Sequence, residues 1–301
     1  MSTKSPISKL TVLGAGLMGH GIAQVFMGDD MQVSVWDPNP EALESVPERI
    51  AAHLELMGSD AKFSVDLVAD LASAVRGSEV VIEAAPEELR IKRDLVAQVY
   101  SVNAECIFAT NTSVLRITEI AEGAKSPELI VGMHWWNPPY LMPLVEVVRG
   151  ERTSDDTVAR SIELLTAFDK VPVEVHKDVP GFVGNRMQFA LMREAAYIVE
   201  QGICSAETVD RVASLTFGRR LAAVGPLRNA DFIGLDLVRS ILDYLSPSLS
   251  RATTTPELFT DALSAGATGA KSGRGIYDWG SGERESVEAR LLAHLVSLRD
   301  E

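Results

Sequence analysis

His134 and Glu146 have the residue types and the spacing needed to take a proton from a hydroxyl group. His134 follows an apolar run, and Glu146 lies 12 positions later, within the next apolar run. A turn through Asn137, Pro138 and Pro139 would bring the two runs side by side and place the carboxylate against the imidazole. The imidazole could then act as a general base, while the carboxylate orients the ring and stabilises its protonated form.

Taken alone, a histidine in an apolar segment is more often a structural residue than a base. Removal of a hydroxyl proton is one half of the oxidation of an alcohol, and the other half needs a hydride acceptor. The catalytic interpretation of His134 therefore depends on whether the same chain binds a nicotinamide cofactor.

A glycine-rich segment near the start of the chain predicts a dinucleotide site, and it consists of Gly14, Ala15, Gly16, Leu17, Met18 and Gly19. It follows an apolar run and precedes apolar residues at helical spacing. In this pattern Gly14 permits a sharp turn, Gly16 lets the backbone approach a pyrophosphate, and Gly19 lets helix and strand pack closely. The start of the helix offers unpaired N–H groups to the pyrophosphate.

Asp37 indicates which dinucleotide binds. It ends the second apolar run, 18 residues after Gly19, where a carboxylate can accept hydrogen bonds from an adenosine ribose. Asp37 would repel a 2′-phosphate, and the next base along the chain is Arg49, so NAD is favoured over NADP. A glycine turn that merely packs a helix is the alternative, and it leaves Asp37 without a role.

Apolar runs alternate with segments of helical spacing over the first part of the chain. Short apolar runs predict buried strands, and apolar residues at threes and fours predict helices. The predicted strands cover residues 10–13, 32–36, 79–85, 106–109, 129–133, 144–148 and 171–175. The predicted helices cover residues 22–26, 41–57, 66–76, 89–99 and 158–168, with another beginning near residue 117. These elements indicate an α/β fold with a Rossmann-type doubly wound sheet.

Strand patterns stop near residues 178–184, and the rest of the chain is nearly all helical. We therefore expect an NAD-binding domain over residues 1–180 and a smaller all-α domain over residues 181–301. A long helix over residues 187–199 is apolar on two adjacent faces. Such a helix is buried on most sides, either by its own domain alone or also by a second subunit.

Hydrogen-bonding side chains gather after the strand at residues 106–109, as Thr110, Asn111, Thr112 and Ser113. Ligands bind at the carboxyl ends of strands in open α/β sheets, so this cluster is a candidate part of the site. Alternatively, Thr112 or Ser113 simply caps the helix near residue 117.

Composition excludes several classes of function. The 301 residues carry a formal net charge of −14, which argues against binding to nucleic acid or to an anionic membrane. The two cysteines, Cys106 and Cys204, have no metal-ligand spacing, so we expect free thiols, no metal and a reducing compartment. No apolar run reaches membrane length and residues 1–8 do not read as a signal peptide, so we expect a cytoplasmic protein.

The motifs together resemble the 3-hydroxyacyl-CoA dehydrogenase family over nearly the whole chain. The matching segments are Gly14–Ala23, Asn111–Ser113, His134–Pro138, Pro180–Arg186, Gly225–Asp236 and Lys271–Gly275. The resemblance implies that Ser113 and Asn185 belong to the catalytic site with His134 and Glu146. It also implies cofactor contacts from Glu87, Lys92, Asn111, Asn137 and Lys271. By the same resemblance, the last strands run antiparallel to the others, and homodimers form through the helical domain, which also helps to bind substrate.

Departures from the family pattern concern the substrate. Fatty-acid members follow the histidine with two phenylalanines, where this chain has Trp135 and Trp136. The segment after Asp37 is short and acidic, whereas the mitochondrial enzymes have a longer, lysine-rich segment that grips the phosphates of CoA. Relatives with similar departures oxidise free hydroxy acids, carnitine, gulonate or a pyridine aldehyde acid.

Three functions therefore remain open. The first, which is the function we expect, is NAD-dependent oxidation of the secondary hydroxyl of a short-chain (S)-3-hydroxyacyl-CoA to the 3-ketoacyl-CoA, as in fatty acid metabolism. The second is the same chemistry on a free hydroxy acid or aldehyde acid without CoA. The third, from another class, is a non-catalytic NAD-binding structural protein like lambda-crystallin, against which the intact His134, Glu146, Ser113 and Asn185 argue.

Overall fold

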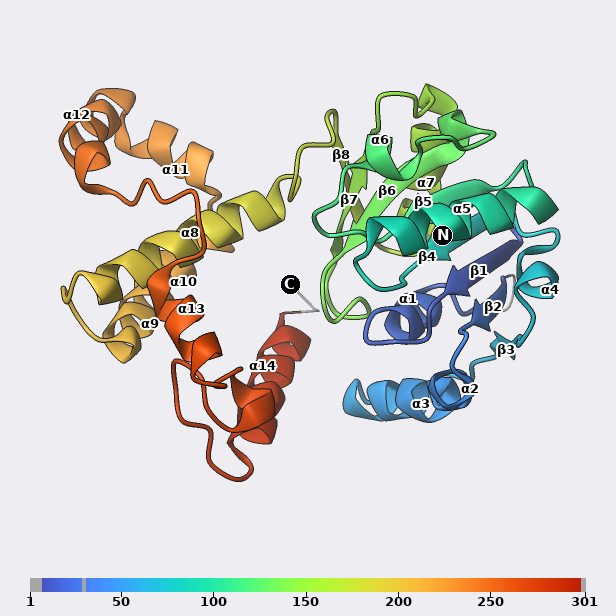
Figure 1. Cartoon of the computed structure of the whole chain (residues 1–301), viewed down its shortest axis with the longest axis horizontal. Helices are drawn as coiled ribbons and strands as arrows, with labels where there is room; N and C mark the ends of the chain where they lie inside the picture. The colour runs from blue at the N-terminus through green and yellow to red at the C-terminus, as the bar shows by residue number, and fades with distance from the viewer. Residues whose placement is uncertain (1–6, 29–30, 299–301) are drawn as a thin grey trace. The chain divides into compact units, whose positions relative to one another are not determined.

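In the computed structural model, which describes residues 7–28 and 31–298, one eight-stranded sheet forms the core of the first part of the chain (Figure 1). The strand order across the sheet is β3-β2-β1-β4-β5-β6-β7-β8. The strands are β1 (Lys9–Leu13), β2 (Gln32–Trp36), β3 (Asp66–Leu67), β4 (Val80–Glu83), β5 (Ile107–Thr110), β6 (Ile130–Trp135), β7 (Leu144–Val148) and β8 (Val171–Val175).

Strand directions change once across the sheet. Neighbouring strands from β3 to β6 are parallel, β6 and β7 are antiparallel, and β7 and β8 are parallel to each other. The last two strands therefore run against the rest, as the family resemblance implied. The predicted Rossmann-type sheet is confirmed.

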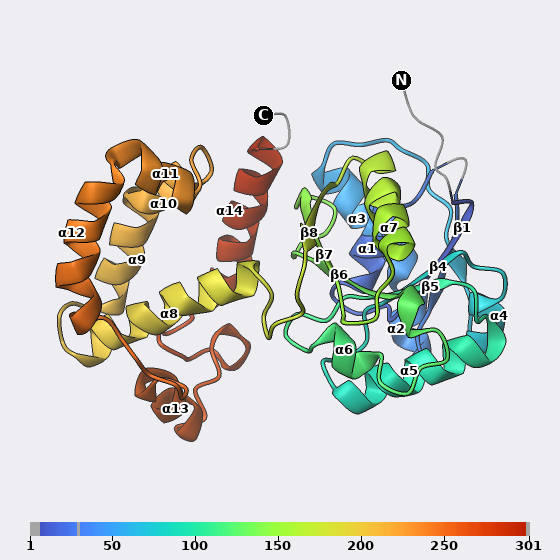
Figure 2. The same cartoon turned by 90° about the horizontal axis from the view of Figure 1, so that it is seen from above.

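Helices cover both faces of this sheet (Figure 2). The helices of this part are α1 (Gly19–Val25), α2 (Pro40–Glu44), α3 (Val46–Leu56), α4 (Leu71–Val75), α5 (Leu89–Val102), α6 (Ile117–Ile120) and α7 (Asp155–Ala167), with a 3₁₀ turn, η1 (Pro127–Leu129). Strand side chains alternate between the faces, so that Val12 belongs to the core cluster shared with α1, α3 and α7, while Leu13 of the same strand belongs to the one shared with α5 and α6.

Two predicted helices have different bounds in the structure. The helix expected over residues 41–57 is two helices, because Pro47 has no N–H to donate and instead begins α3 in its first turn. Residues 66–76 do not form one helix either. Asp66–Leu67 extends the sheet beside β2, and α4 follows with Asp70 as its N-cap. A two-residue, exposed strand carries no apolar pattern that could have revealed it.

The described chain divides into two compact units, one reaching Asn185 and including the segment from Leu292 on, the other spanning Arg186–Leu291. Further helices follow β8: α8 (Gly184–Glu200), α9 (Ala206–Leu215), α10 (Phe217–Leu221), α11 (Pro226–Ile233), α12 (Leu235–Leu245), α13 (Glu257–Ser264) and α14 (Glu283–Ser297), with the 3₁₀ turns η2 (Ser246–Ser248) and η3 (Ala270–Ser272). None of the helices described is both long and apolar enough to cross a membrane.

The long apolar helix α8 is not buried by its own chain. Ala196 is the one residue of α8 that is buried within the described chain, while Met187 and Phe189 are each 55% exposed. The expectation that its own domain covers most of this helix is therefore wrong. An apolar pattern shows which faces of a helix must be buried. It does not show whether the same chain or another chain buries them.

Candidate functional site

The antiparallel pairing of β6 and β7 brings His134 and Glu146 directly opposite each other. Nδ1 of His134 lies 2.7 Å from Oε2 of Glu146, and both side chains are buried. An ionised carboxylate only accepts hydrogen bonds, so Nδ1 carries the proton and Nε2 is the nitrogen left to act on a substrate. The geometry is that of a base held and oriented by a carboxylate.

The other oxygen of Glu146 is held by the start of α8. Oε1 accepts hydrogen bonds from the backbone N–H groups of Val183 at 3.0 Å and Gly184 at 3.1 Å. Burial would raise the pKa of Glu146, but the hydrogen bond from His134 and those from Gly184 and Val183 outweigh it and hold the pKa below its usual value. The carboxylate therefore stays charged, which stabilises a protonated imidazole beside it.

Two aromatic rings flank the imidazole of His134. The ring centroid of Trp136 lies 5.1 Å away and that of Phe182 lies 5.7 Å away, both tilted relative to the imidazole. The imidazole is therefore confined by one hydrogen bond and two ring contacts.

A cavity of about 530 Å³ opens at the carboxyl ends of the parallel strands, beside the glycine-rich segment. Gly14 has a φ of +104°, and a Cβ there would lie 2.7 Å from the carbonyl oxygen of Ala84. A Cβ at Gly19 would lie 1.7 Å from the carbonyl oxygen of Gly14. At Gly16, by contrast, an added Cβ would meet no described atom within 4 Å. This pattern fits a dinucleotide: two glycines close the turn, and Gly16 leaves the backbone open to a ligand.

Asp37 lines this cavity and also fixes the glycine loop. Its Oδ2 accepts a hydrogen bond from the N–H of Ala15 at 2.7 Å, and its Oδ1 accepts one from Asn39 at 2.8 Å. A carboxylate can accept about four hydrogen bonds, so capacity remains for ribose hydroxyls.

Arg49 and His20 hold the other side of the glycine loop. Arg49 donates to the carbonyl oxygens of Ala15 at 2.9 Å and Gly16 at 3.4 Å, and Nδ1 of His20 lies 2.6 Å from the Gly16 carbonyl oxygen. Neither residue was predicted to contact this loop. The position of His20 directly after Gly19 was a signal, whereas the approach of Arg49 depends on how α3 packs against α1.

Lys92 lies in a buried ion pair. Its Nζ donates to Oε1 of Glu83 at 2.8 Å and lies 3.4 Å from Oε2 of Glu87, and its side chain is 1% exposed. Glu83, which is fully buried, also accepts hydrogen bonds from the Ala85 N–H and the Thr110 hydroxyl. Sequence reasoning missed Glu83, although an acid inside a buried strand nine residues before a lysine is a recognisable signal.

Glu87 lies at the edge of the cavity and organises the segment after β5. Oε1 accepts hydrogen bonds from the Thr112 hydroxyl and from the N–H groups of Ser113 at 2.9 Å and Val114 at 3.1 Å. Burial would raise the pKa of Glu87, but the Thr112 hydrogen bond and the charge of Lys92 outweigh it and lower the pKa. Capping of the next helix by Thr112 or Ser113 is wrong, because α6 begins after Arg116 without a side-chain cap.

The predicted asparagines have separate positions. Asn111 lines the cavity and accepts a hydrogen bond from the Trp135 N–H at 2.9 Å. Asn185 donates to the carbonyl oxygen of Ser113 at 3.0 Å, so these two predicted residues are brought together. Asn137 is exposed and precedes a cis peptide bond to Pro138.

Lys271, the remaining predicted cofactor contact, belongs to η3 in the second unit, and its role stays a prediction. The described residues include no group of three or more His, Cys, Asp or Glu side chains that could hold a metal.

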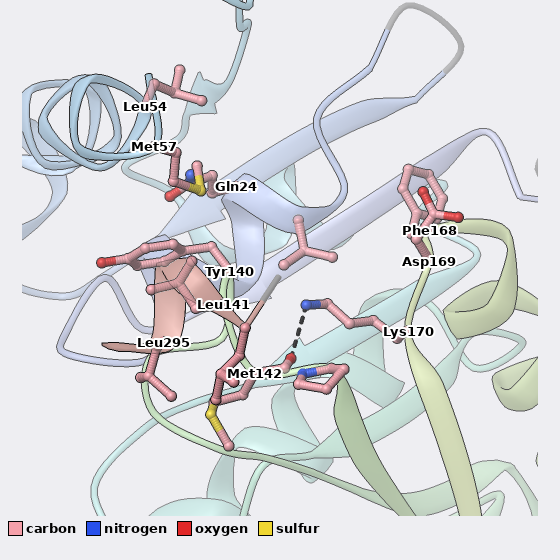
Figure 3. A pocket seen from close by; sticks show the side chains of 13 residues that line it. Gln24, Leu54, Met57, Tyr140, Leu141, Met142, Phe168, Asp169, Lys170 and Leu295 are labelled. Carbon is pink, nitrogen blue, oxygen red and sulfur yellow. Dashed lines mark hydrogen bonds between the residues drawn. The ribbon is translucent and has the colours of Figure 1, made fainter. Parts of the chain in front are cut away.

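A second cavity, of about 640 Å³, is lined by residues that include Gln24, Tyr140, Met142, Lys170 and Leu295 (Figure 3). Nζ of Lys170 donates to the carbonyl oxygens of Pro139 at 2.7 Å and Met142 at 3.0 Å, and burial lowers its pKa to about 8. The ammonium lies 5.9 Å from the ring centre of Trp135, which points to the opposite face of the sheet from His134. This cavity is therefore separate from the His134–Glu146 pair.

Comparison with known proteins identifies the family. The model of the "3-hydroxyacyl-CoA dehydrogenase, NAD binding domain" matches residues 9–179, and that of the family's C-terminal domain matches residues 181–279. Two solved structures are similar. One is a 5-formyl-3-hydroxy-2-methylpyridine 4-carboxylic acid 5-dehydrogenase, described as an NAD⁺ dependent dismutase, with a TM-score of 0.92 and 33% identity over 97% of both chains. The other is (S)-3-hydroxybutyryl-CoA dehydrogenase from Ralstonia eutropha, with a TM-score of 0.74 and 30% identity over 91% of this chain and 99% of that chain.

The names of the sequence relatives indicate three kinds of substrate. The chain is 34% identical to the pyridine-carboxylate 5-dehydrogenase of Mesorhizobium japonicum, over 97% of each chain. It is 36% identical to "Probable 3-hydroxybutyryl-CoA dehydrogenase" of Bacillus subtilis over 91% of this chain and 98% of that protein, and 35% identical to L-carnitine dehydrogenase of Streptomyces coelicolor over 92% of each. The chain therefore belongs to the 3-hydroxyacyl-CoA dehydrogenase family, as an NAD-dependent dehydrogenase acting on CH–OH groups.

Proposed function

We propose that this dehydrogenase oxidises a small free acid without CoA, a hydroxy acid or an aldehyde acid. The observation that carries the proposal is the charge of residues 38–66, which follow β2. This fully described segment has two cations, Arg49 and Lys62, against six carboxylates, those of Glu41, Glu44, Glu48, Glu55, Asp60 and Asp66. In the related fatty-acid enzymes the corresponding segment is lysine-rich and grips CoA.

The contacts of Arg49 limit what it can offer to a phosphate. Arg49 keeps its charge, but its guanidinium donates to the carbonyl oxygens of the glycine loop, so Lys62 is the other cation of residues 38–66. The several phosphate charges of CoA would therefore meet a net negative field on this segment. A substrate with a single carboxylate meets much less repulsion, so the segment favours a free acid.

The relatives support the same substrate class. The pyridine-carboxylate 5-dehydrogenase structure matches this chain with a TM-score of 0.92, against 0.74 for the hydroxybutyryl-CoA enzyme from Ralstonia eutropha. A formyl group presents a CH–OH group once it is hydrated, so a hydroxy acid and an aldehyde acid can use the same base.

The proposed mechanism assigns the proton to His134. Nε2 of His134 takes the hydroxyl proton, and Glu146 stabilises the imidazolium that forms. Ser113 and Asn185, which the family resemblance places at the substrate, would bind the reacting oxygen. NAD, when bound, supplies the acceptor for the hydride. The glycine loop, Asp37, Glu87 and Asn111 would hold it, with Lys92, Asn137 and Lys271 proposed as further contacts by resemblance.

A second candidate is a short-chain (S)-3-hydroxyacyl-CoA of fatty acid metabolism. The names of the hydroxybutyryl-CoA relatives favour it, since one such protein is 36% identical over 91% of this chain. The same base, carboxylate and cofactor site would serve both substrates, so the candidates differ in what binds the rest of the substrate.

A substrate comparison separates the two candidates. We would follow NADH consumption with free acetoacetate, acetoacetyl-CoA and the pantetheine thioester of acetoacetate, and NADH formation with carnitine, gulonate and pyridine acids. We expect a free acid to give the highest kcat/KM, and the CoA and pantetheine esters to have similar, weak apparent affinities. Micromolar affinity for the CoA ester that is lost in the pantetheine ester would show that the nucleotide is gripped and would favour the second candidate.

We also propose that the enzyme is a cytoplasmic homodimer that binds neither nucleic acid nor membrane. The net charge of −14 supports the absence of polyanionic partners. Cys106 and Cys204 are both free thiols in the described chain, as suits a reducing compartment. The exposed apolar face of α8 supports a second subunit.

A further inference from the structure

Beside His134, the indole of Trp136 fills the space that a side chain at Gly184 would occupy. A Cβ added at Gly184 would lie 2.2 Å from Cζ2 of Trp136, 2.9 Å from Cη2 and 3.3 Å from Cε2. Real Cβ contacts are essentially never below 3.0 Å, so even alanine at position 184 would require movement. Gly184 does not have a positive φ, so the backbone conformation does not require glycine here. Glycine is required because the indole occupies the space that a Cβ would need.

The backbone at position 184 is not free to retreat from the indole. The N–H groups of Val183 and Gly184 both donate to Oε1 of Glu146, and the side chain of the next residue, Asn185, donates to the carbonyl oxygen of Ser113. Movement of this segment would break hydrogen bonds to the carboxylate that orients the base. A side chain at position 184 would therefore displace the indole, the Glu146 hydrogen bonds, or both.

Both displacements reach His134. The indole of Trp136 is in ring contact with the imidazole, at a centroid distance of 5.1 Å, and Phe182 contacts the imidazole at 5.7 Å. Nδ1 of the imidazole is bonded to the same carboxylate that receives the Gly184 N–H. Trp136 and Gly184 thus meet each other and each also touches the His134–Glu146 pair.

We propose that Trp136 is a positioning residue for His134, and that Gly184 is the glycine that the position of its indole requires. The proposal rests on the proposed role of His134 as the base. Trp136 and Gly184 form a size-matched pair: the indole sets the orientation of the imidazole, and the missing side chain at position 184 provides its space. An indole that merely filled apolar volume would affect stability and leave the imidazole unchanged.

The test is a double-substitution cycle with Gly184→Ala, Trp136→Phe and the combined variant. Alanine alone should lower kcat on the order of 10²-fold, the cost typical of a base displaced by about 1 Å, without raising the KM for NAD. Phenylalanine is shorter than tryptophan and vacates the region of Cζ2 and Cη2. The combined variant should therefore recover kcat to within about threefold of Trp136→Phe alone, although it carries one more substitution.

A readout that needs no substrate keeps this inference separate from the proposed function. The readout is the pH titration of the His134 imidazole, followed by NMR. This titration should differ from that of the wild type in Gly184→Ala. In the combined variant it should return toward the titration of Trp136→Phe. If no substrate of the panel is turned over, the proposed function fails while this titration still decides the inference. If Gly184→Ala does not fold, thermal unfolding of the combined variant decides it, because a size-matched pair requires the second substitution to restore folding.

Two matched controls separate positioning from general damage. Trp135→Phe makes the same exchange at the neighbouring residue, whose ring contacts Phe26 and Lys170 on the other face of the sheet. It should lower the unfolding temperature and leave the His134 titration unchanged. Gly225→Ala adds a Cβ that would meet no described atom within 4 Å, and it should leave the His134 titration unchanged.

Three results would overturn the inference. The first is a Gly184→Ala variant that retains more than about a third of kcat with an unaltered His134 titration. The second is a combined variant that recovers no better than Gly184→Ala. The third is a Trp135→Phe variant whose His134 titration changes as much as that of Gly184→Ala.

Discussion

At the scale of single residues, His134 touches a carboxylate and two aromatic rings, and in the proposed mechanism its Nε2 takes the substrate proton. We expect His134→Gln to lower kcat by the amount that general-base catalysis supplies, on the order of 10²–10⁴-fold. NAD affinity should stay unchanged, since the ring acts on the alcohol. Steady-state kinetics with NAD titrations measures both quantities. A variant that retained more than about a tenth of the rate would require another base.

Glu146 gives a prediction with a defined direction in pH. Glu146→Gln removes the charge that stabilises the protonated imidazole and keeps an oxygen that can accept hydrogen bonds from Val183 and Gly184. We expect a lower rate and an acidic limb of the pH–rate profile displaced to lower pH. A profile that kept its position would mean that this carboxylate only orients the ring.

We propose two functions for Asp37, and one substitution can separate them. It holds the N–H of Ala15, and its charge would repel the 2′-phosphate of NADP. Asp37→Asn keeps an acceptor for Ala15 and removes the charge, so we expect the preference for NAD over NADP to fall about tenfold, or 1.4 kcal/mol. Asp37→Ala should also lower the preference for NAD over NADP. It should weaken NAD binding as well, because the glycine loop loses the acceptor for the Ala15 N–H. A wild-type enzyme that bound NADP more tightly than NAD would contradict this role.

At the scale of elements, α1 and α3 meet through a group of titratable rings behind the glycine loop. The rings of His20 and His53 lie 5.0 Å apart, His53 stacks on Tyr140 at 4.0 Å, and its Nδ1 lies 2.8 Å from Oε1 of Gln24. Burial, followed by the charges of His20 and Arg49, lowers the pKa of His53 to about 4 from 6.5. The imidazole of His53 is therefore neutral in the folded protein at neutral pH.

This lowered pKa predicts a loss of stability in acid. Between pH 6.5 and about 4 the unfolded chain binds more protons at His53 than the folded chain does, so the free energy of unfolding falls as the pH falls. We expect His53→Phe, which keeps a ring against Tyr140, to flatten the decline in unfolding temperature over this range. Equal slopes in the two proteins would contradict the shift.

At the scale of the whole molecule, the helical unit exposes several large apolar side chains. Met187, Phe189, Leu227, Phe232 and Tyr244 are all more than half exposed. Exposed apolar patches of this kind mark interaction surfaces. We expect a homodimer, measured by sedimentation at micromolar concentration.

A charge on this surface should break the dimer. Phe232→Glu is expected to shift the enzyme toward the monomer, whereas Leu56→Glu, at a less exposed position on α3 of the first unit, should not. A fully active wild-type monomer at micromolar concentration would contradict dimerisation.

The sequence by itself determined the features that depend on short stretches of chain. The apolar runs predicted seven of the eight strands, because a buried strand needs consecutive apolar residues wherever it lies. The glycine pattern predicted the loop, because Gly14 and Gly19 leave no room for a Cβ within the turn itself. His134 and Glu146 were predicted to meet because the chain between them is short enough for one return between neighbouring strands.

Only the tertiary structure decided which distant segments surround these features. Arg49 reaches the glycine loop because α3 packs on α1, and β3 exists because β2 offers it an edge. Trp136 and Gly184 meet because the start of α8 is bound to the carboxylate of Glu146. Each of these contacts depends on the packing of whole elements, which no local pattern of residues specifies, and the space beside His134 is therefore a property of the folded chain.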